Sequence, residues 1–96
     1  MYLMRPDEAQ LIDMDKVESV HVSRETKSIK INFESGRGCE IARYNTYEQC
    51  RYVLGMIMQA LRAEERTFLV PQEVDLDVAR RHSSQFKTSK NRHGGS

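Results

Sequence analysis

The chain has 96 residues, of which 39% are hydrophobic and 30% are charged, with no Trp and two Pro. This is ordinary globular composition, which excludes collagenous and low-complexity chains and leaves no room for a second hydrophobic core. The net charge of +1 is unevenly distributed, because residues 1–79 carry ten Lys or Arg and all fourteen Asp or Glu, whereas residues 80–96 carry five Lys or Arg and no acid.

The N-terminal ten residues contain no apolar run typical of a signal peptide, and no stretch approaches the roughly 20 apolar residues that span a bilayer. Cys39 and Cys50 lie eleven positions apart, which is neither a Cys-x-x-Cys pair nor a disulfide framework. We therefore expect a soluble, cytoplasmic protein with reduced thiols and no membrane contact.

Three segments alternate between apolar and polar residues with the period of a half-buried strand. They are residues 11–22, residues 29–34 and residues 39–44. The glycine-containing loop at residues 35–38 separates the last two, and glycine supplies the positive φ that tight hairpin turns require. The sequence therefore predicts a small antiparallel sheet.

One amphipathic helix follows the sheet. Thr46 and Gln49 have the spacing of a capping box, in which each side chain bonds to the other residue's backbone N–H. Apolar residues then recur every three or four positions until about Glu65, at Cys50, Val53, Leu54, Ile57 and Leu61. This stripe predicts a helix that covers the apolar face of the sheet.

Residues 67–70 predict a short fourth strand that Pro71 ends, and we expect this strand to lie at the edge of the sheet or to begin a new turn. Residues 72–82 are compatible with a short C-terminal helix. Residues 83–96 contain one large apolar residue, so we expect a basic, disordered tail. The predicted fold is thus α+β: one domain over residues 1–82, with three to four antiparallel strands packed on one helix.

Carboxylates occur in two Asp-x-Asp pairs, Asp13 with Asp15 and Asp75 with Asp77, which could approach a divalent cation. No third ligand at a fixed spacing completes either pair. The three histidines lie far apart at His21, His82 and His93. We expect no metal and no cofactor.

Cys39 follows a Gly-x-Gly segment, which superficially resembles a nucleophile beside backbone N–H groups. Turn geometry alone explains glycine in a hairpin, and the strand-to-helix context of a phosphate-binding loop is missing. We therefore expect no catalytic residue and no enzymatic activity.

Basic residues suggest two kinds of ligand. A tail that neutralises phosphates would bind nucleic acid. The candidates for that role are Arg80, Arg81, Lys87, Lys90 and Arg92. A small anionic, nucleotide-like ligand held between subunits would instead be bound by Arg37, Arg43 or Arg51.

Several apolar residues exceed what one sheet and one helix can bury, and such a surplus is typical of an interface. They are Met56, Met58, Phe68, Leu69, Val74, Leu76 and Val78. We expect a homo-oligomer, with a two-fold dimer favoured, and a protein partner.

The order of features in residues 12–61 resembles small βββα proteins of bacteria and their phages. These features are the segment Asp15-Lys16-Val17-Glu18-Ser19-Val20, then Ile29-Lys30-Ile31-Asn32-Phe33 before the glycine turn, then Tyr44-Asn45-Thr46-Tyr47-Glu48 opening the helix. In outline this plan is similar to the short flagellar-regulator family FlbD/SwrD. The resemblance covers about half of the chain and implies an accessory protein that regulates or inhibits a partner by binding it, phage inhibitors of a host protein included.

Overall fold

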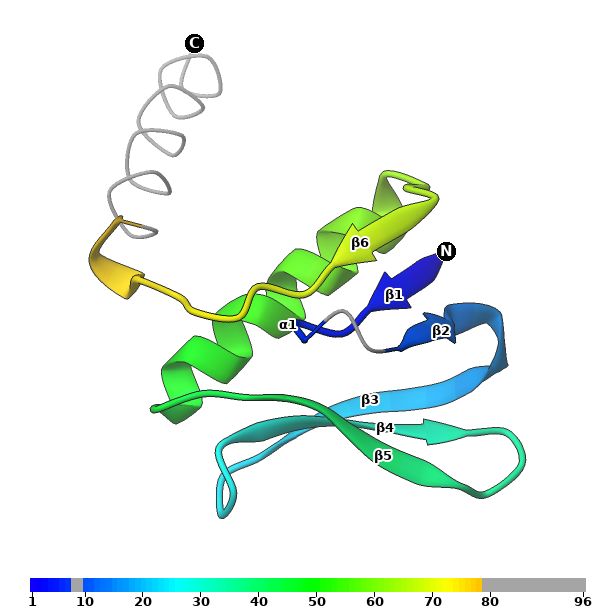
Figure 1. The fold of residues 1–96 in the computed structure, drawn as a ribbon, viewed down its shortest axis with the longest axis horizontal. Helices are drawn as coiled ribbons and strands as arrows, with labels where there is room; N and C mark the ends of the chain where they lie inside the picture. The colour runs from blue at the N-terminus through cyan, green and yellow to red at the C-terminus, as the bar shows by residue number, and fades with distance from the viewer. Residues whose placement is uncertain (8–9, 79–96) are drawn as a thin grey trace, which may run out of the picture.

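The computed structural model describes residues 1–7 and 10–78, which form two three-stranded sheets, a long helix and a short 3-10 helix (Figure 1). In chain order the elements are β1 (Tyr2–Met4), β2 (Leu11–Asp13), η1 (Met14–Lys16), β3 (Val17–Ser23), β4 (Ser28–Phe33), β5 (Gly38–Arg43), α1 (Tyr47–Arg62) and β6 (Thr67–Leu69). We call the sheet with strand order β2-β1-β6 sheet A and the sheet with order β3-β4-β5 sheet B. The predicted small α+β fold is confirmed, but the expectation of one antiparallel sheet of three to four strands is wrong, because the described strands form two sheets and β6 pairs parallel with β1.

Sheet B is an antiparallel meander whose inner face is apolar. β4 supplies Ile29 and Ile31 to this face, and both are fully buried. Between β4 and β5 the register shifts at Ile29 and Lys30. This β-bulge allows two successive residues of β5, Ile41 and Ala42, to be buried together, which strict alternation would not allow.

The predicted hairpin between β4 and β5 depends on two glycines. Gly36 has a φ of 91°, a conformation that other residues rarely adopt. At Gly38, a Cβ atom would lie 2.8 Å from Oδ1 of Asn32 and 3.2 Å from the carbonyl oxygen of Ile31. The first glycine is therefore needed for the turn, and the second for the close approach of β4.

Sheet A is centred on β1, which the sequence did not predict. β1 pairs antiparallel with β2 and parallel with β6, so that Leu3 lies opposite both Ile12 and Phe68. The strand predicted for residues 11–22 is divided into β2 and β3 by η1. The division occurs because Oδ1 of Asp13 accepts a hydrogen bond from the backbone N–H of Asp15 at 3.0 Å and so caps the 3-10 helix.

The predicted capping box begins α1. Oγ1 of Thr46 accepts from the N–H of Gln49 at 3.1 Å, and Oε1 of Gln49 accepts from the N–H of Thr46 at 3.0 Å. The helix buries Cys50, Val53, Ile57 and Ala60. Leu61, which the sequence placed in the buried stripe, is 45% exposed, because the inward position at this end of the helix belongs to Ala60.

The core lies between α1 and the inner faces of the two sheets. Its fully buried large side chains are Leu3, Ile29, Ile31, Ile41, Val53, Ile57 and Val70. In Figure 1, α1 runs diagonally above sheet B, and β6 returns along it toward the start of the helix. The core therefore joins the first and last described strands to the central hairpin.

Residues 71–75 follow β6 without regular structure, and residues 76–78 are helical. Asp75 caps this helical turn, because its Oδ1 accepts from the N–H of Asp77 at 3.0 Å and of Val78 at 3.3 Å. The rest of the helix expected in residues 72–82, and the tail expected in residues 83–96, lie outside the described residues. None of the described helices has the length and hydropathy needed to cross a bilayer.

Candidate functional site

The outer face of sheet A, opposite the core, carries a group of apolar side chains, although the positions on either side of Tyr2 are polar, Asp13 on β2 and Thr67 on β6. The register places Met4 of β1 between Leu11 of β2 and Leu69 of β6, and Tyr2 follows on the same face because side chains alternate along a strand. Leu11 and Leu69 are each 53% exposed, and Tyr2 is 48% exposed. We call these four side chains the outer apolar face.

Single exposed apolar residues are common, whereas a contiguous group of them marks an interaction surface. Leu69 was an interface candidate from the sequence, but Tyr2, Met4 and Leu11 were missed. The available signal was the uninterrupted apolar run of residues 1–4, which gains meaning only when β1 is known to lie between two other strands.

A second apolar surface lies between α1 and the segment that follows β6. This groove has a volume of about 300 Å³ and is lined by Tyr52, Met56, Pro71, Glu73, Val74, Asp75 and Val78. The hydroxyl of Tyr44 donates to the carbonyl of Pro71, and Nε2 of Gln49 donates to the carbonyl of Val74 at 2.8 Å. These two bonds tie the segment to the body and so fix the wall of the groove.

The structure distributes the predicted interface residues over several surfaces. Met56, Val74 and Val78 meet in the groove, and Leu69 lies on the outer apolar face. Phe68 points toward the core and is partly buried against it, while Leu76 is half-buried. Met58 is 48% exposed on α1.

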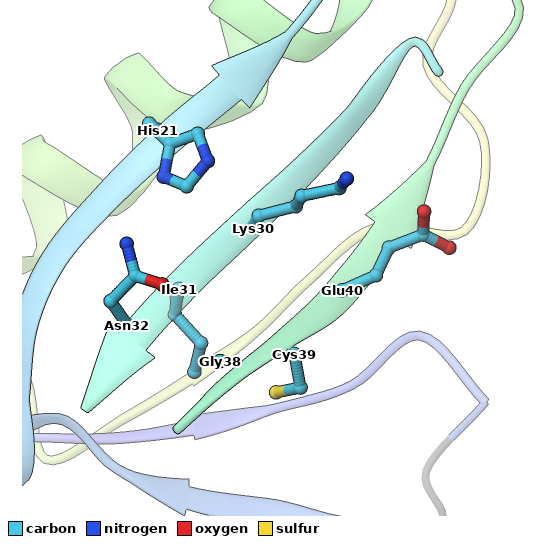
Figure 2. A pocket seen from close by; sticks show the side chains of 7 residues that line it. All are labelled: His21, Lys30, Ile31, Asn32, Gly38, Cys39 and Glu40. Atoms are coloured by element: carbon cyan, nitrogen blue, oxygen red, sulfur yellow. The ribbon is translucent and has the colours of Figure 1, made fainter. Parts of the chain in front are cut away.

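The outer face of sheet B is polar (Figure 2). His21 of β3, Lys30 and Asn32 of β4 and Glu40 of β5 project from it around a shallow hollow of about 500 Å³. Nδ2 of Asn32 donates to the hydroxyl of Ser19 at 3.1 Å. This face offers polar contacts without an enclosed cavity.

Glu40 and Arg43 form an ion pair on the same strand, with Nη2 of Arg43 2.8 Å from Oε1 of Glu40. The hydrogen bond from Arg43 lowers the pKa of the Glu40 carboxyl below its ordinary value. Arg43 is therefore already engaged, and it is 61% exposed in its side chain, so the pair contributes little to stability.

Cys39 lies opposite Ile31 in the ladder between β4 and β5. Opposed residues point to the same face, and Ile31 is fully buried, so Cys39 packs against the core, although both residues also line the hollow beside His21 (Figure 2). Cys50 is buried in α1, and burial raises the pKa of its thiol. A raised pKa disfavours the thiolate, which is the nucleophilic form.

Both Asp-x-Asp pairs serve as helix starts. In each pair the first carboxylate accepts from the backbone N–H of the second Asp, at 3.0 Å for Asp13 and Asp15 and at 3.0 Å for Asp75 and Asp77. Within residues 1–7 and 10–78, no three His, Cys, Asp or Glu side chains gather in a way that could hold a metal ion.

Two of the basic residues proposed for an anionic ligand, Arg37 and Arg43, lie far apart along one strand. Arg37 and Arg43 flank opposite ends of β5, a distance of about 20 Å at the rise of an extended strand. Arg51 lies on α1, with its guanidinium carbon 6.0 Å from the centroid of the Tyr47 ring. The nucleic-acid candidates, Arg80, Arg81, Lys87, Lys90 and Arg92, lie outside the described residues.

No protein-family model, no curated protein and no solved structure matches the chain. The resemblance to the FlbD/SwrD plan therefore stays a prediction from the sequence.

Proposed function

We propose that this protein is a non-enzymatic interaction module that acts through the outer apolar face and the adjoining strand β6, and that its first partner is a second copy of itself. The observation that carries this proposal is the group of Tyr2, Leu11 and Leu69, each about half exposed on one sheet face around Met4. In a chain of this length the core is small, and association supplies burial that the monomer lacks.

Covering this small surface on association should contribute an appreciable favourable free energy. Burying a large apolar side chain completely contributes about 1.5–3 kcal/mol, so covering the exposed half of one residue contributes about 1 kcal/mol. Leu11, Leu69 and Tyr2 in two copies provide six such contributions. Their sum exceeds the lower estimates, about 4 kcal/mol, for the entropy lost on association.

The test compares Leu69→Lys with Met58→Lys by sedimentation velocity at micromolar concentration. The two residues are matched in exposure, 53% and 48%, but Met58 lies on α1. A lysine on an edge strand opposes strand pairing and desolvation, so Leu69→Lys should shift the population to monomer while Met58→Lys leaves it unchanged. Equal behaviour of the two variants, with folding intact by circular dichroism, would show that the surface is assigned wrongly.

A further inference from the structure

The edge of β6 that faces away from β1 is open within the described part of the chain. The N–H of Tyr2 donates to the carbonyl of Arg66 at 2.8 Å. In the parallel register that contains this bond, the N–H and the C=O of Phe68 both point to β1. The N–H and C=O groups of Thr67 and Leu69 therefore point the other way. No described strand lies there, and Figure 1 shows β6 with β1 on one side only.

β6 is only three residues long, which itself limits strand pairing, but two other common protections, charge and proline, are missing from it. Residues 67–69 include no charge and no proline, and Leu69 is exposed. We infer that a second copy of this chain pairs with it, β6 to β6, in antiparallel orientation with Phe68 on the two-fold axis. The inference rests on the self-association proposed above and specifies only its contact at β6, because pairing in the plane of the sheet does not cover the outer apolar face.

Pairing about Phe68 sets Thr67 of each copy opposite Leu69 of the other. Both residues carry outward-directed N–H and C=O groups, so the two opposed pairs form four hydrogen bonds. All the open peptide groups of both strands are then satisfied. The two copies of sheet A become one six-stranded sheet with a continuous outer apolar face.

The residues that flank β6 disfavour the neighbouring registers. An axis at Leu69 would set Thr67 opposite Pro71, which has no N–H and whose carbonyl already accepts from the hydroxyl of Tyr44. An axis at Thr67 would set Leu69 opposite Glu65, whose N–H already donates to the last turn of α1 at 3.1 Å. Either shift leaves open peptide groups without partners, which costs free energy when they are buried.

The inner side of the edge has space for the aromatic ring that arrives with the second copy. A hollow of about 320 Å³ lies beside Phe68 and is lined in part by Met56, Ala60 and Ala63. Opposed residues point to the same face, so Phe68 of the second copy approaches this hollow. Ala60 near the end of α1 and Ala63, its C-cap, have small side chains that leave this space open, and the flexible side chain of Met56 can adapt to the ring.

Disulfide trapping tests the register. Two single variants, Thr67→Cys and Leu69→Cys, are made in a Cys39→Ser background, with Cys50 left in its buried position. Opposed residues have Cα atoms about 5.5 Å apart, within disulfide reach, whereas identical residues would lie about 8 Å apart, beyond it. Under mild oxidation the mixture of the two variants should give a crosslinked dimer, and neither variant should do so alone.

Each other outcome overturns a defined statement. Crosslinking of Leu69→Cys alone, or of Thr67→Cys alone, moves the axis to that residue and refutes the Phe68 register. A dimer by light scattering that no combination crosslinks places the contact elsewhere, for example on the outer apolar face, and refutes the inference while self-association stands. A monomeric mass for the background protein refutes both.

Discussion

Replacing Gly55 by Ala should stabilise the protein. Gly55 lies in the interior of α1, and a Cβ atom built there meets no other atom within 4 Å. Alanine is favoured over glycine in a helix interior by about 0.8–1.0 kcal/mol, because glycine loses more backbone entropy on folding. With no steric cost to subtract, the free energy of unfolding should rise by nearly that amount. For a domain of this size the Tm should rise by roughly 4–8 °C.

The assay is thermal unfolding followed by circular dichroism at 222 nm, with Gly38→Ala as the matched control. At Gly38 the same added methyl group would lie 2.8 Å from Oδ1 of Asn32 and 3.2 Å from the carbonyl oxygen of Ile31. The backbone oxygen cannot turn aside, so this variant should have a lower Tm. A Tm of Gly55→Ala at or below that of the unsubstituted protein would refute the placement of this residue in open space on α1.

Three further predictions concern the helix cap and the titrating groups. Thr46→Ala removes the acceptor of the Gln49 N–H and should lower the free energy of unfolding by about 1 kcal/mol. In urea unfolding the midpoint should fall while the m-value stays constant, and an unchanged midpoint would contradict the capping box. Burial raises the pKa of both Tyr44 and Cys50, so the folded state favours their protonated forms. Because both groups ionise more readily in the unfolded chain, the Tm should be constant up to about pH 8 and should fall as the pH rises through about 9 to 10. A Tm independent of pH over that range would show that the two groups are not buried. A thiol reagent in excess should label half-buried Cys39 before fully buried Cys50, and equal rates would contradict their burial.

The parts of the fold that sequence reasoning predicted correctly are those set by local signals. The hairpin of β4 and β5 follows from alternation and from the glycine turn, and α1 follows from its capping box and periodic apolar residues. β6 does lie at a sheet edge within the described chain, but it pairs parallel with β1 in sheet A and not with the predicted antiparallel sheet. These signals extend over a few residues, so no knowledge of distant contacts is needed to interpret them.

The parts that the sequence did not predict depend on contacts between distant segments. β1 is three residues long, and its pairing with β6 joins Tyr2 to Thr67, so neither length nor periodicity indicates it. Asp13 looked like a solvent-facing strand residue, but its side chain caps η1 and divides the expected strand. Tyr2 and Leu11 are exposed because their strands flank the outer face of sheet A, which requires the assembled sheet to be seen.

The groove and the outer apolar face also differ in how far the sequence predicted them. The interface residues Met56, Val74 and Val78 were predicted as surplus apolar residues, and the structure brings them together in one groove. Leu69 was predicted by the same argument, but its neighbours on the outer apolar face come from β1 and β2 and could not be assigned to it from spacing alone.

The central claim, that the outer apolar face and β6 make this chain associate with itself, is tested most directly by light scattering behind a sizing column. The mass of the unsubstituted 96-residue chain is measured over a dilution series from micromolar concentrations downward. Self-association predicts a mass of twice 11.2 kDa at the highest concentrations, falling toward 11.2 kDa on dilution. A mass of 11.2 kDa at every concentration would contradict it.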